Sequence, residues 1–178
     1  SDLADVQAKG EMVIGITYFA PMNYLDDNNE LVGFETEFAK AVCAKLGVEA
    51  KFQEIIWDSK VMELNSGNID CIWNGMTMTD ELAEQIDFST PYMANKQVCV
   101  IRTENADTYT DLASMNGATV VAESGSAGES AATSDPNLSG KFISVTAQAD
   151  GLNEVKAGTA DVAVMDAVMA YSMVGENT

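Results

Sequence analysis

The chain has 178 residues, a length that suits one large domain or two small lobes. Apolar residues make up 47% of it and charged residues 21%, which is typical of a globular protein and excludes a disordered tail or a disulfide-rich miniprotein. The net charge of −19 excludes nucleic acids and anionic membrane surfaces as partners, because both would repel it. Histidine is absent, which excludes histidine-based catalysis and histidine-containing metal sites.

The sequence contains no apolar run of the about 18 residues that a membrane span needs, and its start lacks the pattern of a secretory signal. A mature exported protein is compatible with this, since cleavage removes the signal. Cys43, Cys71 and Cys99 lack metal-ligand spacing and lie in apolar segments. We interpret them as buried, unreactive thiols in preference to a disulfide or a catalytic group.

Strand and helix patterns alternate along the first half of the chain, which is typical of an α/β protein with largely parallel sheets. An apolar strand at 12–17 precedes a turn-rich stretch, and a helix over 34–47 ends at Gly47. The further expected elements are a strand at 49–54, a helix at 59–66, a strand at 70–73, helical turns at 80–86 and a strand at 96–102.

The same alternation starts again near residue 108. Its expected elements are helices at 111–117, 126–133, 147–157 and 166–174, and strands at 118–122, 141–145 and 161–165. We therefore predict two α/β lobes, each a mostly parallel sheet flanked by helices. Because no linker rich in proline, glycine or serine separates them, the predicted divisions are lobe one at 1–95, a hinge strand at 96–102 and lobe two at 103–178.

One pattern occurs in both lobes. A helix ends in glycine, an aspartate follows three residues later (Asp70, Asp161), and an apolar strand then leads to a polar residue (Asn74, Asp166). Ligands of open α/β sheets bind at the carboxyl ends of the strands. Two interpretations stay open: Asn74 and Asp166 face a ligand, or they cap the helices that follow.

Two loops are further candidates. Residues 73–82 could form a cradle for a carboxylate from main-chain N–H groups and hydroxyls, or an ordinary loop with Thr79 as a helix N-cap. Residues 123–130 form a glycine–serine turn without the glycine pattern and lysine of a nucleotide-binding loop. Glu123 and Asp166 could act as general acid and base or, more simply, hold a cation.

Several segments follow one another in a distinctive order: LVGFETEFAKAVCAKLGVEAKF, LNSGNIDCIWNGMTMT, QIDFSTPY, the glycine–serine loop and AGTADVAVMD. Together they resemble the polar amino-acid family of solute-binding proteins, over nearly the whole chain from about residue 10. The resemblance implies the two-lobed type II periplasmic-binding-protein fold and the role of an extracytoplasmic receptor of an ABC importer. Such a receptor binds a small ligand between its lobes and docks on a membrane permease.

The resemblance also implies a set of ligand contacts. An aromatic residue at the position of Trp57 would cover the ligand, and the acid at Asp166 would bind its α-ammonium group. It implies a non-enzymatic protein with no cofactor and no metal. The implied contacts are Phe19, Trp57, Asn74, Gly75, Met76 and Thr77 in lobe one, and Glu123, Ser126, Ala127 and Asp166 in lobe two.

The sequence departs from the family pattern at two binding positions. Leu82 stands where the family usually has an arginine that clamps the ligand α-carboxylate. Thr17 stands where an aspartate helps to hold the ammonium group. The ligand could therefore differ from an ordinary α-amino acid, or Lys60 or Arg102 could replace the missing arginine.

The third departure is the end of the chain. Family members continue for several tens of residues beyond the helix that follows Asp166 and so complete lobe one. We expect an incomplete lobe one with an open strand edge and an exposed apolar face. A truncated or proteolysed product would explain this, and so would a chain that completes itself as a homodimer.

Three functions are compatible with these features. The first is a solute receptor for an amino acid or another amine-bearing cation, which the acidic residues favour over an anion. The second is a sensory or scaffold module with an altered ligand, suggested by Leu82 and the short end. The third is a dehydratase-like enzyme on the same fold, which is least favoured because the chain has one arginine, no histidine and few lysines.

Overall fold

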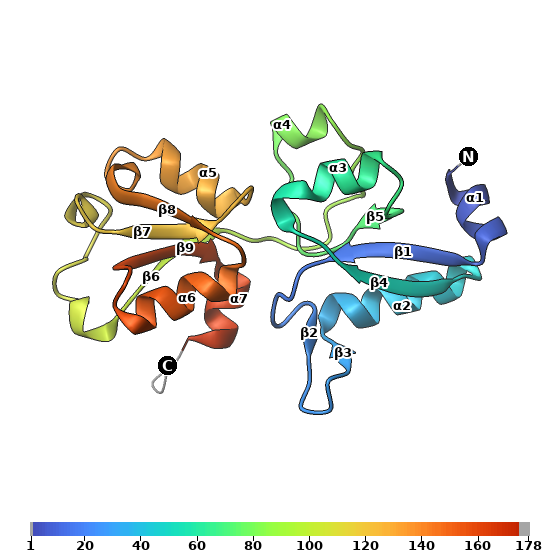
Figure 1. Cartoon of the computed structure of the whole chain (residues 1–178), viewed down its shortest axis with the longest axis horizontal. Helices are drawn as coiled ribbons and strands as arrows, with labels where there is room; N and C mark the ends of the chain where they lie inside the picture. Colours follow the sequence, from blue (N-terminus) through green and yellow to red (C-terminus); the bar gives the residue numbers. More distant parts are fainter. Residues whose placement is uncertain (1, 175–178) are drawn as a thin grey trace. The chain divides into compact units, whose positions relative to one another are not determined.

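The computed structural model describes residues 2–174 and divides the chain into two compact units, one up to Pro91 and one from Tyr92 onward. Each unit has its own sheet with flanking helices (Figure 1). The division lies a few residues before the predicted end of lobe one. The hinge role of residues 96–102 stays a prediction.

Unit 1 is built on a parallel sheet of three strands in the order β4-β1-β5. A separate antiparallel hairpin pairs β2 with β3. In chain order, the elements are α1 (Asp2–Lys9), β1 (Glu11–Ile16), β2 (Tyr24–Leu25), β3 (Leu31–Val32), α2 (Phe34–Leu46), β4 (Glu49–Glu54), the 3-10 turn η1 (Trp57–Ser59), α3 (Lys60–Asn65), β5 (Cys71–Ile72) and α4 (Asp80–Ala83).

The core of unit 1 lies between the central strand β1 and helix α2. Successive residues of a strand point to opposite faces, so Ile14 and Ile16 share one face, where they join Ala39 and Cys43 of α2 in one buried cluster. Gly47 ends α2 in the left-handed conformation at φ 76°, as expected from the sequence. This packing fixes the carboxyl end of β1, where the site begins.

Unit 2 is built on a four-stranded sheet in the order β6-β9-β7-β8, in which only β6 is antiparallel to its neighbour. Its elements are β6 (Gln97–Ile101), the 3-10 turns η2 (Thr103–Asn105) and η3 (Ala113–Met115), β7 (Val120–Glu123), α5 (Ala127–Ser134), the 3-10 turn η4 (Ser139–Lys141), β8 (Phe142–Val145), α6 (Gln148–Ala157), β9 (Val162–Asp166) and α7 (Ala167–Met173).

The two central strands of unit 2 are buried on both faces. Val120 of β7 belongs to the cluster that contains Ala132 of α5, whereas Val121 belongs to the cluster that contains Val155 of α6. Helices α5 and α6 therefore cover opposite faces of the sheet (Figure 1). This two-sided cover explains why β7 and β9 are continuous apolar runs in the sequence.

The structure confirms the predicted mixed α/β class, and the predicted strands and helices recur with ends shifted by a few residues. Helix α1, the β2–β3 hairpin and the 3-10 turns η2 and η4 were not predicted. The short helix expected at 111–117 was wrong in type and length, because only the 3-10 turn Ala113–Met115 forms there.

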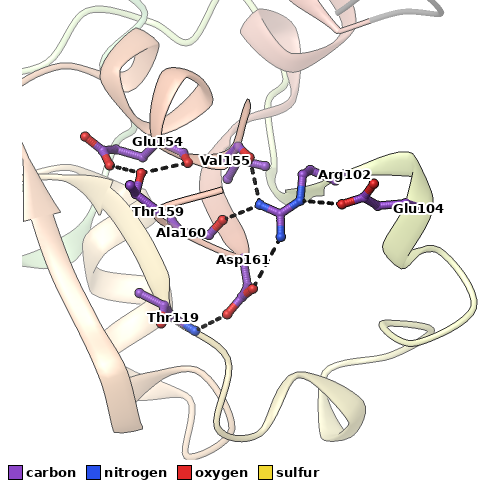
Figure 2. Close-up of polar contacts among 8 residues, drawn as sticks. All are labelled: Arg102, Glu104, Thr119, Glu154, Val155, Thr159, Ala160 and Asp161. Atoms are coloured by element: carbon purple, nitrogen blue, oxygen red, sulfur yellow. Dashed lines mark hydrogen bonds and ion pairs between the residues drawn. The ribbon is translucent and has the colours of Figure 1, made fainter. Parts of the chain in front are cut away.

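The sequence pattern shared by the lobes is also a structural repeat. The main-chain N–H of Asp70 donates to the Val13 carbonyl at 2.8 Å, and the Asp70 carboxylate accepts from the Val13 N–H at 2.7 Å. Asp161 makes the same two contacts with Thr119, each at 2.8 Å. Figure 2 shows the one from the Thr119 N–H to the Asp161 carboxylate. In each unit, the aspartate that directly precedes one strand thus binds the parallel neighbouring chain segment, at Val13 within β1 and at Thr119 directly before β7.

Candidate functional site

The carboxyl ends of β1 and β5 lie side by side because the two strands are paired in parallel. Thr17 follows β1, and Asn74 follows β5 two residues beyond its end. The Thr17 hydroxyl donates to Asn74 Oδ1 at 2.7 Å, and Asn74 Nδ2 donates to the Thr17 carbonyl at 2.9 Å. The hydroxyl of Thr17 therefore holds the loop after β5.

A buried polar network continues from Asn74 into unit 1. Asn74 Nδ2 also donates to Asn23 Oδ1 at 2.8 Å, and Asn23 Nδ2 donates to the Thr36 hydroxyl at 3.0 Å. The N–H of Gly75 donates to the Glu35 carboxylate at 2.9 Å. Asn23, Glu35 and Thr36 are fully buried. These three residues were not predicted as part of the site, since they lie in a turn-rich stretch and at the start of a helix.

The side chain of Asn74 does not cap the helix that follows, so that interpretation was wrong. Its amide binds Thr17 and Asn23, and Thr79 is the N-cap of α4, accepting from the Leu82 N–H at 3.2 Å. Asn74 therefore sets the path of the loop. The next two predicted contacts, Met76 and Thr77, are half-buried and make no hydrogen bond within residues 2–174.

Phe19 and Gly75 are in close contact at this edge of the sheet. Gly75 has a φ of 61°, and a Cβ atom there would lie 2.8 Å from Phe19 Cε1. Only glycine fits both the backbone conformation and the space. Phe19 is buried against this loop, so the structure brings the predicted residues Phe19, Asn74 and Gly75 together.

Trp57 begins the turn before α3 and is buried. Lys60 is buried beside it: its Nζ donates to the Trp57 carbonyl at 3.3 Å and lies 4.8 Å from the centroid of the ring. This is a cation–π contact. The predicted aromatic residue Trp57 is therefore in contact with a lysine. Lys60 is one of the two cations considered as a replacement for the arginine that is missing at Leu82.

The acids Glu123 and Asp166 lie at the carboxyl ends of β7 and β9, which are neighbouring parallel strands. Glu123 is 3% exposed and Asp166 is 7% exposed. Acidic side chains are almost never buried to this degree without partners. Asp166 immediately precedes α7, but its side chain makes no cap hydrogen bond to it, so the cap interpretation was wrong here too.

Three side-chain amides surround the Asp166 carboxylate. Asn95 Nδ2 donates to Oδ1, Gln97 Nε2 donates to Oδ1 at 2.9 Å, and Gln148 Nε2 donates to Oδ2 at 2.5 Å. Gln97 Oε1 is buried without a hydrogen-bond partner in the described part of the chain. An unsatisfied buried acceptor costs about 1–3 kcal/mol. The Gln97 side chain directs its amide nitrogen to Asp166, and we attribute the unsatisfied oxygen to this orientation.

All three partners of Asp166 are neutral. None of the ion pairs among the described residues involves Asp166. A buried carboxylate without a counter-charge is costly, and an added cation would lower this cost. Within residues 2–174, no group of three or more acidic or cysteine side chains could hold a metal ion.

The glycine–serine turn after β7 is held by its own side chains. The Ser126 hydroxyl accepts from the Glu129 N–H at 3.1 Å and so caps α5, whose first residue is Ala127. Glu129 in turn accepts from the Gly125 N–H at 2.7 Å and from the Ser144 hydroxyl at 2.5 Å. The predicted contacts Ser126 and Ala127 thus follow Glu123 at the carboxyl edge of the sheet of unit 2.

The hypothesis that Arg102 binds a ligand carboxylate was wrong. Arg102 follows β6 at the end opposite to Gln97, which pairs with Asp166. Its guanidinium donates to the carbonyls of Val155 and Ala160, both at 2.9 Å (Figure 2). It also contacts the Glu104 and Asp161 carboxylates. The arginine is therefore a structural residue at the far edge of the sheet.

Residues 12–161 match the family of bacterial extracellular solute-binding proteins, family 3. The chain belongs to this family. The predicted resemblance is therefore confirmed, and it covers both units. No helix of the described residues is long and apolar enough to span a membrane.

The names of the relatives describe proteins that bind amino acids. The chain is 34% identical over 107 residues to the L-cystine-binding protein TcyJ of Escherichia coli, which covers 60% of this chain and 40% of that protein. It is 27% identical over 172 residues to the arginine-binding extracellular protein ArtP of Bacillus subtilis, covering 96% of this chain and 66% of that protein. The alignment to TcyJ thus spans less than half of that relative.

Solved structures confirm the type II periplasmic-binding-protein fold. The structure of a mutant of ArgBP from T. maritima matches this chain with a TM-score of 0.92 and 29% sequence identity. The match covers 99% of this chain and 77% of the ArgBP chain. The ancestral amino acid-binding protein AncCDT-1, a precursor of cyclohexadienyl dehydratase, matches 96% of this chain and 77% of its own with a TM-score of 0.90 and 30% identity.

Proposed function

We propose that this chain is the substrate-binding component of an ABC importer and binds a small amino acid or a related amine-bearing solute. The family and the names of the relatives support a solute-binding role. We further propose an extracytoplasmic location and a membrane permease as partner, as the family description suggests.

The observation that carries this proposal is the environment of Asp166. Its carboxylate is 7% exposed, lies at the carboxyl edge of the sheet and has only neutral amide partners among the described residues. An ammonium group would supply the missing positive charge. Glu123 is buried at the carboxyl end of the neighbouring strand β7, so a second acidic side chain lies at this edge of the sheet.

Unit 1 carries proposed ligand contacts of its own. We propose that Trp57 and Phe19 provide apolar contact and that the loop from Gly75 to Thr77 provides main-chain donors. Leu82 provides no charge for a carboxylate. Lys60, beside Trp57, is the cation that we propose for this role.

A ligand screen tests the proposal. Melting temperature and calorimetric affinity are measured with L-arginine, L-cystine and L-histidine, and with the decarboxylated amines agmatine and cystamine. We expect at least one probe to raise the melting temperature and to bind with a 1:1 stoichiometry. Absence of binding by every amino acid and amine would contradict a receptor for such solutes.

Leu82 favours a second candidate function, a sensory or scaffold module with an altered ligand. The screen separates the two, since that module would bind none of the amino acids. A dehydratase-like enzyme is the least supported function. The amino acid-binding name of the neighbour AncCDT-1 argues for binding, and formation of product from a prephenate-like substrate would argue for the enzyme.

The predicted homodimer stays a proposal. Size-exclusion chromatography with light scattering tests it directly. A strictly monomeric, folded chain that binds a ligand normally would contradict the homodimer without affecting the proposed receptor function.

A further inference from the structure

The three amides around Asp166 come from two parts of unit 2, the start of β6 and the start of α6. Asn95 lies in the segment before β6, Gln97 is the first residue of β6, and Gln148 is the first residue of α6. Gln148 makes two contacts with the same residue, because its Oε1 also accepts from the Asp166 N–H at 2.9 Å. The carboxylate is thus held at both oxygens, at Oδ1 by Asn95 and Gln97 and at Oδ2 by Gln148.

These contacts use most of the hydrogen-bonding capacity of the carboxylate. An ionised carboxylate has about four lone-pair positions, two on each oxygen. Asn95 and Gln97 both donate to Oδ1, and Gln148 donates to Oδ2. One position therefore remains, and it belongs to Oδ2.

We infer that Asn95, Gln97 and Gln148 are positioning residues that restrict Asp166 to a single N–H donor from the ligand, and so select an ammonium group over a guanidinium group at this carboxylate. A guanidinium binds a carboxylate best through two parallel hydrogen bonds, one to each oxygen. The amides on Oδ1 prevent this arrangement, whereas an ammonium needs only one acceptor here. The inference rests on the proposed function, in which Asp166 binds the ligand.

Asn95 is the amide that can be removed with the least effect on folding. It is exposed and precedes the first strand of unit 2, whereas Gln148 joins α6 to the end of β9 through two contacts. Asn95→Ala frees one lone-pair position on Oδ1 and leaves both contacts of Gln148 in place. Asn153→Ala, at an exposed position of α6, is the matched control.

The first measurement needs no ligand. Exchange of the side-chain amide protons of Gln148 with solvent is followed by NMR in the wild-type protein, and the exposed Gln85 serves as reference. We expect the Gln148 amide to exchange at least about tenfold more slowly, because it donates to a buried carboxylate. Exchange as fast as that of Gln85 would overturn the inference.

The second measurement compares two probes by calorimetry: L-arginine and Nα-amidino-L-arginine, in which a guanidinium replaces the α-ammonium group. We expect the wild type and Asn153→Ala to prefer L-arginine by at least about tenfold, and Asn95→Ala to reduce this preference at least about threefold. An effect of Asn95→Ala on folding alone would lower the affinity for both probes equally. An unchanged preference in Asn95→Ala, or equal binding of both probes by the wild type, would overturn the inference.

The two proposals fail in different ways. If neither probe nor any other amino acid binds while the Gln148 amide is protected, the proposed function is wrong and with it the selection of a ligand group. If L-arginine binds without preference over its amidino derivative, the receptor function stands and the selective role of the amides is wrong.

Discussion

Arg102 Nη2 lies 3.6 Å from Asp161 Oδ1, at the edge of the sheet opposite to Asp166. The same guanidinium donates to two main-chain carbonyls, and Asp161 accepts from the Thr119 N–H (Figure 2). The only arginine of the chain thus joins α6, β9 and the start of β7. Its role in unit 2 is the one that Lys9 has in unit 1, where Lys9 Nζ lies 2.6 Å from Asp70.

We expect Arg102→Met to destabilise unit 2 without changing ligand affinity. The substitution leaves the carbonyls of Val155 and Ala160 without their donor, and hydrogen bonds that involve a charged group contribute about 1.5–3 kcal/mol each. Calorimetric unfolding should show a loss of about 2 kcal/mol in the free energy of unfolding. Lys141→Met, at an exposed position, is the control. Loss of ligand affinity in a folded Arg102→Met protein would contradict the structural role.

The Asp70 contacts predict a pH-dependent contribution to stability. Burial acts to raise the pKa of Asp70, but hydrogen bonds from Lys9 and from the Val13 N–H outweigh it, so the pKa is lowered from 3.8. A group with a lowered pKa in the folded state stabilises above its unfolded pKa and loses this effect as the pH falls through the folded value. We expect Asp70→Asn to lower the free energy of unfolding by about 1–2 kcal/mol near neutral pH, and the difference from wild type to shrink below pH 3.8.

Asp58→Asn is the control for this prediction, since Asp58 is exposed. Urea unfolding is measured for each protein across the acidic range. A difference between wild type and Asp70→Asn that stays constant from neutral to strongly acidic pH would show that the charge of Asp70 contributes nothing.

The cysteines are expected to be unreactive in the folded protein. All three are free thiols; Cys43 is buried as predicted, whereas Cys71 and Cys99 are only half-buried. Burial, with smaller effects from Cys43 and the Asp70 carboxylate, raises the pKa of Cys71 to about 12, and burial also raises the pKa of Cys43 and of Cys99. Because the thiolate is the reactive form, iodoacetamide should label all three residues in guanidinium chloride and Cys71 hardly at all without it. Mass spectrometry measures the labelling, and rapid labelling of native Cys71 would be the contrary result.

The proposed role of Lys60 gives a prediction on ligand selectivity. If Lys60 binds the ligand carboxylate, Lys60→Gln should lower the affinity for L-arginine by about tenfold or more. The affinity for agmatine, which has no carboxylate, should stay nearly unchanged. L-cystine and cystamine form a second such pair. An equal loss for both members of each pair would instead indicate that Lys60 acts through the packing of Trp57.

The strongly patterned parts of the fold could be predicted from the sequence. Helix α2 has a regular apolar spacing and a glycine at its end, and β7 and β9 are apolar because helices cover both their faces. Helix α1 was missed because it is only eight residues long and Val6 is its one buried residue. The β2–β3 hairpin was missed because each strand has two residues.

The candidate site was predicted in part. Asp166 was predicted because the pattern shared by the two lobes, and the family resemblance, place a polar residue at the end of this strand. Asn95, Gln97 and Gln148 were missed, since neutral amides are ordinary surface residues and these lie 18 to 71 positions away from Asp166 in the sequence. The antiparallel register that places Gln97 opposite Asp166 is a property of the folded sheet, and it could be inferred only after the direction of β6 was known.

The central claim is that the Asp166 carboxylate binds the ammonium group of the solute. Isothermal titration of wild type, Asp166→Asn and the exposed control Asp107→Asn with L-arginine and L-cystine tests it most directly, after melting temperatures have shown that each variant is folded. Loss of a buried charge pair costs about 2–5 kcal/mol, so Asp166→Asn should bind about thirtyfold more weakly or worse while Asp107→Asn binds like the wild type. A folded Asp166→Asn protein with the affinity of the wild type would contradict the claim.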